Sequence, residues 1–152
     1  MTVCPAVIRR AVEADIHEIV ALLADDALGA ARETLDDLSP YLDAFQRIDA
    51  DPNLLLMVME RSHVIIGTMQ MAFIPGLSHK GSTRADIEAV RISSAERGGG
   101  LGSQLIEWAI AEARSRGCAM VQLTSNASRT DAHRFYLRLG FVQSHSGFKF
   151  KL

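Results

Sequence analysis

The stretch RGGGLGSQLIEWAI at 97–110 places four glycines at the start of a helix-forming pattern. The glycines are Gly98, Gly99, Gly100 and Gly102, and the apolar residues after them recur with the spacing of one helix face. Glycine loses the most backbone freedom on folding and is a weak helix former. A run of glycines in this place therefore needs a reason, and it constrains the fold to a loop that leads directly into a long helix.

A glycine-rich loop before a helix suits the binding of a phosphate. The first amides of a helix have no partner within it and carry about half a positive charge. Glycines let a phosphate approach this backbone without a Cβ in between. A flexible loop without a ligand is the alternative. Two familiar phosphate loops do not fit, because Ser103 stands where one needs a lysine and the other a third glycine.

The composition is that of one soluble globular domain. The chain has 152 residues, 48% hydrophobic and 22% charged, which is enough for a core of its own. A net charge of −2 is not the basic balance of a nucleic-acid-binding protein. The sequence has neither a signal-peptide pattern nor a membrane-span pattern, and Cys4 and Cys118 suit reduced thiols. We expect a single cytoplasmic domain over 1–152 with no metal, no nucleic acid and no membrane partner.

Apolar periodicity predicts a mixture of helices and strands. Strands are expected at 7–11, 54–61, 64–73, 85–92, 119–125 and 141–152, and helices at 15–28, 39–48, 101–116 and 130–139. The segment 74–83 contains Pro, Gly and Ser and is expected to be a loop. Strands that pair locally and then cross over through a helix indicate a mixed α/β class.

The strand predicted at 85–92 carries the acidic side chains nearest to the glycine loop. Strict alternation would place Ile87 and Ala89 on one face of this strand. Asp86 and Glu88, together with the valine at position 90, would then share the other face. We therefore expect the two carboxylates to face the same side of the sheet.

Two motifs resemble those of the GNAT superfamily of N-acetyltransferases. Residues 97–102 match R/Q-x-x-G-x-G/A, the loop that binds the pyrophosphate of acyl-coenzyme A in that family. Residues 124–141, TSNASRTDAHRFYLRLGF, resemble its second signature, an Asn after a strand and a helix with F-Y-x-x-L-G-F. The resemblance spans about 85–141. It implies an α/β (α+β) fold with a mixed, mostly antiparallel sheet, splayed into a V between its fourth and fifth strands and flanked by helices.

The resemblance implies acetyl-CoA as the cosubstrate. The backbone of Val90 and Ile92 would pair with the pantetheine arm, and the amides of 98–103 would bind the pyrophosphate. Arg97 would contact a phosphate or anchor the loop, with a solvated arginine as the alternative, and Asn126 would bond to the coenzyme or cap the next turn. The expected coenzyme-binding residues are Val90, Ile92, Arg97, Gly98, Gly99, Gly100, Leu101, Gly102, Ser103 and Asn126.

The family's mechanism is direct attack of the amine on the thioester. By resemblance, Tyr136 would donate a proton to the departing thiolate. A tyrosine with a pKa of about 10 can protonate a thiolate whose conjugate acid has a pKa near 8.5. The alternative is that Tyr136 only packs beside Phe135. Glu88 and Asp86 are the candidate bases for the substrate ammonium, and either one can instead be an orienting or surface carboxylate.

Two features of the sequence disagree about the acceptor amine. Residues 25–51 contain eight acidic residues, and the resemblance places this segment over the acceptor site, which would suit a cationic amine; solvated helix faces are the alternative. The C-terminal half resembles the aminoalkylphosphonate N-acetyltransferase branch, which suggests an amine with an anionic group. We expect acetyl transfer to a primary amine of a small molecule. A non-catalytic acyl-CoA sensor and an acetyltransferase of protein N-termini or lysines are alternatives, and a homodimer is compatible with the family.

Overall fold

The computed structural model describes residues 4–152 and divides the chain into two compact units. The first unit extends to Gln122 and contains the sheet and most of the helices. The second unit is Leu123–Leu152 and contains one helix. No helix within residues 4–152 is both long and apolar enough to cross a membrane.

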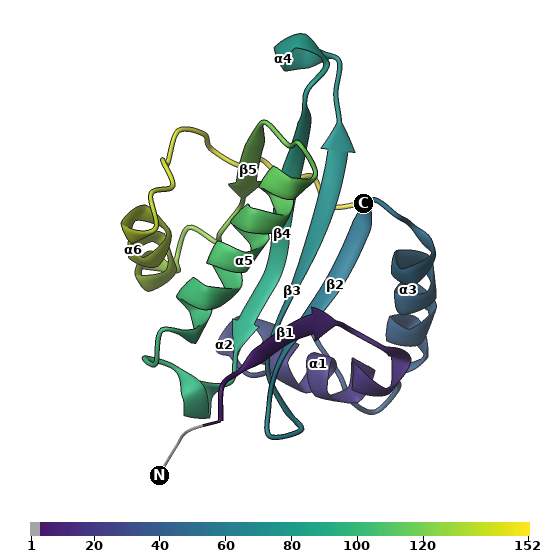
Figure 1. The fold of residues 1–152 in the computed structure, drawn as a ribbon. Helices are drawn as coiled ribbons and strands as arrows, with labels where there is room; N and C mark the ends of the chain where they lie inside the picture. The colour runs from purple at the N-terminus through teal and green to yellow at the C-terminus, as the bar shows by residue number, and fades with distance from the viewer. Residues whose placement is uncertain (1–3) are drawn as a thin grey trace. The chain divides into compact units, whose positions relative to one another are not determined.

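A five-stranded sheet forms the centre of the first unit (Figure 1). The strands are β1 (Val7–Arg10), β2 (Leu54–Arg61), β3 (Val64–Pro75), β4 (Thr83–Ile92) and β5 (Met120–Leu123), and they lie in this order across the sheet. Each neighbouring pair from β1 to β4 is antiparallel, whereas β5 runs parallel to β4. The mixed, mostly antiparallel sheet expected from the sequence is confirmed.

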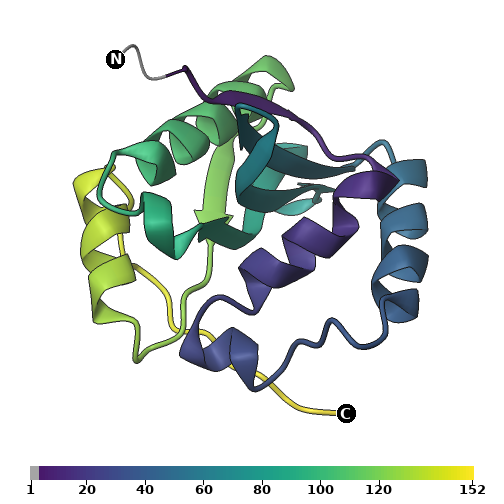
Figure 2. The same ribbon diagram turned by 90° about the horizontal axis from the view of Figure 1, so that it is seen from below.

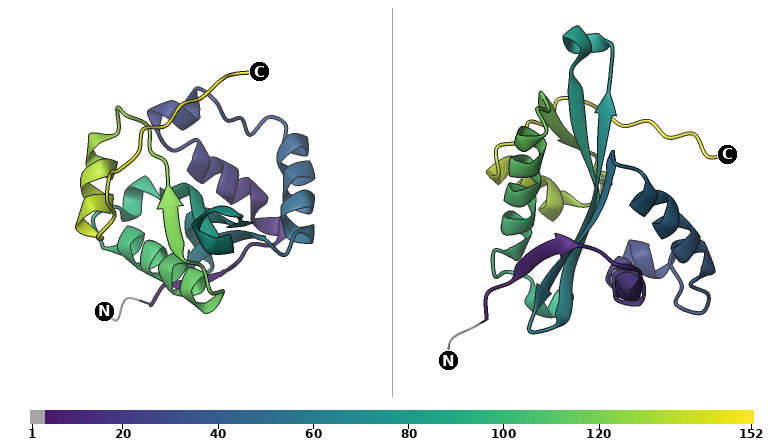
Figure 3. Two further views of the ribbon diagram at one scale, coloured as in Figure 1. Left: turned by 90° about the horizontal axis from the view of Figure 1, so that it is seen from above. Right: turned by 45° about the vertical axis from the view of Figure 1, so that its right-hand side comes forward.

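Helices cover both faces of this sheet. The helices of the first unit are α1 (Ile16–Leu23), α2 (Ala27–Ala30), α3 (Ser39–Ala50), α4 (Ser78–Gly81) and α5 (Leu101–Ser115), and the second unit contains α6 (Thr130–Arg138). Figures 2 and 3 show α1 and α3 on one face of the sheet and α5 on the other. Short 3-10 turns at Glu13–Asp15 and Ser94–Glu96 precede α1 and the glycine loop.

Apolar side chains of the central strands point to alternate faces, so a hydrophobic core forms on each side of the sheet. Val58 belongs to the cluster that packs against α1 and α3, whereas its neighbours Met57 and Met59 lie on the opposite face, which α5 covers. All three side chains are almost completely buried, as are Leu105 and Ile106 of α5. Burying an apolar side chain of this size stabilises the fold by roughly 1.5–3 kcal/mol.

The helix predicted at 15–28 is interrupted, and the prediction of one continuous helix was wrong. It ends at Leu23, and Asp26 then adopts an extended conformation and accepts a hydrogen bond from the backbone N–H of Gly29 at 2.6 Å. Aspartate is a strong N-cap, so a new helix, α2, begins here. A Cβ at Gly29 would lie 1.8 Å from the carbonyl oxygen of Leu23, so the junction needs glycine.

A β-bulge interrupts the alternation predicted for 85–92. Ala89 has φ +53°, and the pairing register between β3 and β4 shifts so that Ala89 and Val90 together stand opposite one residue of β3. A bulge bends the strand and changes which side chains share a face. Arg91, and not Val90, therefore lies on the face of Glu88, and the prediction of unbroken alternation was wrong. Nothing in the local pattern marks the bulge, because alanine seldom adopts this conformation.

Two further predictions on segments were wrong. The expected loop at 74–83 is shorter, because β3 continues to Pro75, α4 forms a turn and β4 begins at Thr83. Residues 141–152 form no strand in the structure as described, and Phe148 and Phe150 are 94% and 90% exposed. A strand needs a hydrogen-bonded neighbour, which alternation of apolar side chains cannot supply. The other elements lie where predicted, with ends shifted by a few residues.

Candidate active site

The glycine loop leaves open space above its backbone. Gly98 and Gly100 have φ angles of +85° and +76°, a region that glycine adopts without the penalty of a Cβ. An ideal Cβ at either position would meet nothing within 4 Å. At Gly99 it would meet only the carbonyl oxygen of Glu96, at 3.7 Å. A side chain at Gly98 or Gly100 would therefore project into open space.

The loop ends at the N-terminus of α5, where no side chain accepts a hydrogen bond from the first backbone amides. Gly100 is the N-cap residue, and the first turn contains no acidic residue. The amides of Leu101, Gly102 and Ser103 thus have no partner within the helix. The helix start and the glycines thus offer backbone donors that suit an anion, and the binding of a pyrophosphate here stays a prediction.

Arg97 anchors the loop in this structure. Its Nε donates to the carbonyl oxygen of Ile92 at 3.2 Å, and a terminal nitrogen donates to the carbonyl oxygen of Asp25 at 3.1 Å. The guanidinium also lies 3.8 Å from the Asp25 carboxylate. Of the two roles predicted for Arg97, these contacts are those of a loop anchor.

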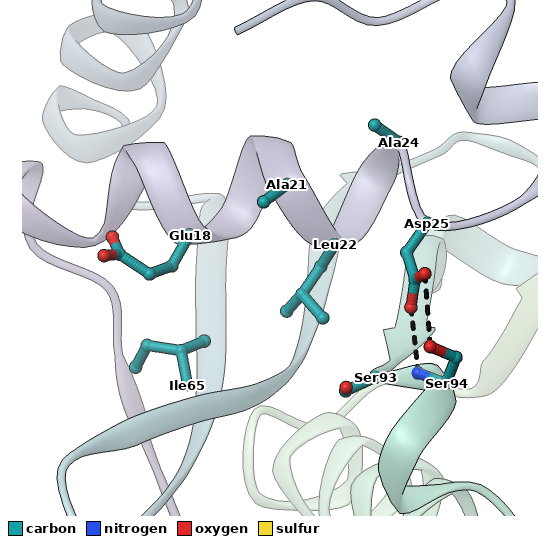
Figure 4. Close-up of a pocket in the computed structure, with 8 residues that line it drawn as sticks. All are labelled: Glu18, Ala21, Leu22, Ala24, Asp25, Ile65, Ser93 and Ser94. Atoms are coloured by element: carbon teal, nitrogen blue, oxygen red, sulfur yellow. Dashed lines mark hydrogen bonds between the residues drawn. The ribbon is translucent and has the colours of Figure 1, made fainter.

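Asp25 fixes the segment just before the loop from across the first unit. Its carboxylate accepts from the backbone N–H of Ser94 at 2.8 Å and from the Ser94 hydroxyl at 3.2 Å (Figure 4). These hydrogen bonds hold the pKa of the Asp25 carboxyl below its ordinary value. Glu96 forms an ion pair with Arg61 of β2 at 2.8 Å. Sequence reasoning missed these anchors, because the partners lie far apart in the chain.

The end of β4 directs polar backbone groups away from β3. The N–H of Ser93 donates to Ile66 of β3 at 2.8 Å, so the backbone groups of Ile92, one residue earlier, point to the other side. The Ile92 carbonyl accepts from Arg97, and the Val90 carbonyl accepts from the Arg91 guanidinium at 2.9 Å. The pairing of Val90 and Ile92 with a pantetheine arm stays a prediction.

The two candidate bases share one face of β4 but differ in their surroundings. Glu88 pairs in register with Gln70 and Asp86 with Ala72 of β3, and these positions lie on the same side of the sheet. The Asp86 carboxylate is half-buried and accepts a hydrogen bond from Nε2 of Gln122 at 3.2 Å. Glu88 is exposed. The expectation that both carboxylates share a face is confirmed, and their catalytic roles stay predictions.

The second unit carries Tyr136 and Asn126. Tyr136 lies on α6, and its ring packs edge-to-face against Phe135 at 5.1 Å and Phe141 at 5.7 Å between centroids. The side-chain oxygen of Asn126 accepts from the backbone N–H and the hydroxyl of Ser128 at 2.9 and 2.7 Å. Asn126 thus caps the turn before α6, and Tyr136 packs beside Phe135 as its alternative predicted. Proton donation and coenzyme contact stay predictions.

Most acidic side chains of residues 25–51 have partners within the fold. The contacts are Asp25 with Ser94, Asp26 with Gly29 and Arg91, Glu33 with Tyr41, Asp37 with Ser39, Asp49 with Arg10, and Asp51 with Asn53. A carboxylate that caps a helix or a turn is less available to a substrate amine. These contacts favour a structural role for the acidic segment.

A hollow of about 450 Å³ lies between α1, the start of β3 and Ser93–Ser94 (Figure 4). Its charged side chains are Glu18 and Asp25, both acidic. Two carboxylates repel a phosphate, so this hollow does not suit the coenzyme. No group of three or more His, Cys, Asp or Glu residues within 4–152 is arranged to hold a metal ion.

Comparison with known proteins decides the family. The sequence profile of the acetyltransferase (GNAT) family matches residues 13–141, which include β4, the glycine loop, α5 and α6. The chain belongs to this family. It is an N-acetyltransferase, and GNAT proteins use acetyl-CoA as the acetyl donor.

Individual relatives and solved structures resemble the chain over nearly its whole length. The chain is 32% identical over 148 residues to an aminoalkylphosphonate N-acetyltransferase of Salmonella typhimurium, covering 97% of this chain and 91% of the relative. A solved structure from Bacillus halodurans, described as a transcriptional regulator, is 46% identical with a TM-score of 0.94, covering 97% and 100% of the two chains. An acetyltransferase from Clostridium acetobutylicum, solved with acetyl-CoA, shares the GNAT fold at 20% identity, with a TM-score of 0.76 and coverage of 97% and 96%.

Proposed function

We propose that this GNAT protein transfers the acetyl group of acetyl-CoA to the primary amine of a small molecule. The observation that carries the proposal is the cradle formed by Gly98–Gly100 and the uncapped start of α5. It follows directly after β4, the strand that carries Glu88 and Asp86. A binding cradle for the donor and a base for the acceptor thus stand on one continuous segment.

The loop residues would bind the donor through its pyrophosphate. A Cβ at Gly98 or Gly100 would meet nothing within 4 Å, and the first amides of α5 lie at the positive end of a long helix, where phosphate oxygens are stabilised. Acetyl-CoA would supply the thioester. The anchors formed by Arg97, Asp25 and Ser94 hold the loop in place before the coenzyme arrives, which lowers the entropy lost on binding.

The acceptor amine must lose a proton before it can attack. At pH 7, deprotonating an ammonium group with a pKa near 10.4 costs roughly 4–5 kcal/mol. We assign the acceptance of this proton to Glu88, directly or through water, because its side chain is exposed to the solvent from which the amine arrives. Asp86 is the second candidate. Its carboxylate already accepts from Gln122, which suits an orienting role better.

Tyr136 is the proposed proton donor. The amine nitrogen forms a bond to the acetyl carbon, the carbon–sulfur bond breaks, and the thiolate takes the phenolic proton. Such a proton transfer contributes typically 10²- to 10⁴-fold to the rate. The edge-to-face contacts with Phe135 and Phe141 would hold the ring in one orientation within its unit.

A screen of amines tests the proposed function. Purified protein with acetyl-CoA is offered aminophosphonates, amino acids, polyamines, aminoglycosides and peptides with a free N-terminus, and release of the coenzyme A thiol is measured. We expect release with one small-molecule class, and the Salmonella typhimurium relative makes aminoalkylphosphonates the first class to try. Acetyl-CoA binding without turnover on any amine would instead support an acyl-CoA sensor, and turnover on peptides alone a protein acetyltransferase.

A further inference from the structure

His133 connects α6 to the turn that precedes this helix. Its Nε2 lies 2.9 Å from the backbone carbonyl oxygen of Asn126, which stands seven positions earlier in the chain. A carbonyl oxygen can only accept a hydrogen bond, so Nε2 carries the proton and donates it. Neutral and protonated imidazole can both carry a proton on Nε2. The contact therefore does not require a charged histidine.

The hydrogen bond from His133 adds a link that the start of the helix lacks. No side chain accepts from the first backbone amides of α6, and helix ends of this kind fray. The backbone N–H of Arg129 also donates to the Asn126 carbonyl, at 2.9 Å. That bond closes the turn on itself, whereas the bond from His133 ties the turn to the body of the helix.

Both oxygen atoms of Asn126 are occupied by groups of the second unit. The side-chain oxygen accepts from the backbone N–H and the hydroxyl of Ser128 at 2.9 and 2.7 Å. The carbonyl oxygen accepts from Arg129 and His133. Each oxygen has two lone pairs, so both are fully used. The N–H of Ser128 can only donate, which decides that Oδ1 and not Nδ2 of Asn126 faces it.

The side-chain nitrogen of Asn126 keeps its two donors for a ligand. Asn126 is exposed, and among residues 4–152 its Nδ2 donates to no other group. Asn126 can therefore serve a ligand only as a hydrogen-bond donor. The ligand atom must be an acceptor, and the amide carbonyl oxygens of the pantetheine arm of coenzyme A are acceptors of this kind.

We propose that His133 is a positioning residue for the coenzyme. By holding the Asn126 carbonyl, it directs the Asn126 side chain so that Nδ2 donates to a carbonyl oxygen of the pantetheine arm. Ser128 fixes the orientation of the side-chain amide itself. Hydrogen bonds that already exist in the free protein reduce the side-chain entropy lost on binding. This inference rests on the proposed function, because it deepens the account of how the same coenzyme is bound.

The test separates the arm of the coenzyme from its nucleotide. Calorimetry gives Kd for coenzyme A and for 3′-phospho-ADP, which keeps the pyrophosphate and lacks the arm. The wild type should prefer coenzyme A. Asn126→Asp keeps the acceptor for Ser128 and removes the donor, and His133→Ala removes the link to the turn. Each variant should reduce the preference by about 3- to 10-fold, the effect of losing one hydrogen bond.

Two further substitutions distinguish the position of the donor from the mere presence of a polar group. His133→Gln places an amide nitrogen where Nε2 stands, and should restore the preference for coenzyme A. His133→Asn is too short to reach the Asn126 carbonyl, and should behave like His133→Ala. The double variant of Asn126→Asp and His133→Ala should lose little more than Asn126→Asp alone, because His133 acts through Asn126.

Controls separate this inference from the proposed function. Arg134→Gln removes an ion pair with Asp131 in the same helix, leaves the turn untouched and should keep the wild-type preference. An unchanged preference in a folded His133→Ala variant, His133→Gln no better than His133→Ala, or additive losses in the double variant would overturn the role of His133. A wild type that binds both ligands equally would overturn the contact of Asn126 with the arm. Failure of the wild type to bind either ligand would overturn the proposed function instead.

Discussion

The starts of α2 and α5 lie in the same unit and are built in opposite ways. At α2, Asp26 is extended, accepts from the N–H of Gly29 and forms an ion pair with Arg91. At α5, Gly100 takes the capping position, and no side chain accepts from the first amides. At α2 a side chain of the protein accepts from the first backbone amides, whereas at α5 these amides have no side-chain acceptor.

The difference indicates what each helix start is for. Glycine at an N-cap costs a helix only about a few tenths of a kcal/mol relative to serine or aspartate, so the start of α5 keeps its first amides open at little cost in stability. At α5 a Cβ at Gly98 or Gly100 would meet nothing within 4 Å, which leaves room for the anion that we propose in place of a capping side chain. At α2 the Asp26 carboxylate already accepts from the backbone N–H of Gly29, so this helix start has a structural role.

The segment before α2 also holds the glycine loop before α5 in place. Asp25, next to the cap of α2, accepts from Ser94 just before the glycine loop, and its carbonyl accepts from Arg97. The loop therefore combines fixed ends with an unobstructed middle. This arrangement suits a ligand that must find its backbone donors already in position.

The largest expected effect comes from placing a side chain in the glycine loop before α5. Gly100→Val forces a β-branched residue into φ +76° and places its side chain in front of the α5 amides. We expect no measurable acetyl-CoA binding by calorimetry. Gly117→Val is the matched control, because Gly117 has φ +72° and equally open space at the other end of α5. Both variants should lose a similar 1–2 kcal/mol of stability, but Gly117→Val should still bind. Unchanged binding by Gly100→Val would remove the cradle assignment.

A second expectation separates binding at α5 from chemistry at Tyr136. Tyr136→Phe keeps the ring that packs against Phe135 and Phe141 and removes only the hydroxyl. Because the thiolate would lose its proton donor, kcat should fall by about 10²-fold, while the Kd for acetyl-CoA should change little. Stopped-flow turnover and calorimetry on the same preparation measure the two quantities. Wild-type kcat at saturating substrate would leave Tyr136 with a packing role only.

The third expectation concerns the two carboxylates of β4. Replacing the true base should lower kcat/KM at neutral pH by at least about tenfold, with partial recovery at alkaline pH, where more of the amine is already neutral. Glu88→Gln should show this pH dependence, whereas Asp86→Asn, which keeps an acceptor for Gln122, should change kcat/KM less. The measurement is a pH profile for each variant. The reverse result would exchange the two roles, and two profiles like the wild type would mean that the amine loses its proton elsewhere.

The smallest expected effect comes from removing the N-cap of α2. Asp26→Ala removes the cap of α2 and the ion pair to Arg91, and should lower the free energy of unfolding by about 1–2 kcal/mol. Asp26→Asn keeps a capping acceptor and should lose less. Acetyl-CoA affinity should stay near that of the wild type in both variants, as urea unfolding and calorimetry can establish. A large loss of coenzyme affinity would mean that the two helix starts are not independent.

Much of the fold could be predicted from short segments of the chain. The helix from Leu101 to Ser115 follows from its apolar spacing and ends at Gly117, which has the positive φ expected of a helix-ending glycine. The hairpin of β2 and β3 follows from two apolar strands around a tight turn. The glycine loop, the paired carboxylates and Tyr136 were also named from the sequence. These features depend on residues that are neighbours in the chain or stand in a short motif.

Other features depend on contacts between distant residues, and only the tertiary structure decides them. Asp25 meets Ser94 across 69 positions, and the bulge at Ala89 exists in the pairing of β4 with β3. The partners of Arg61 and Arg91 cannot be read from their sequence neighbours, because their ion pairs join separate elements. Local periodicity reports which face of an element is apolar, but it carries no information about what packs against that face. The sequence by itself therefore determined most of the elements, the family motifs and the candidate catalytic groups. The three-dimensional packing decided which distant residues pair and where β4 bulges.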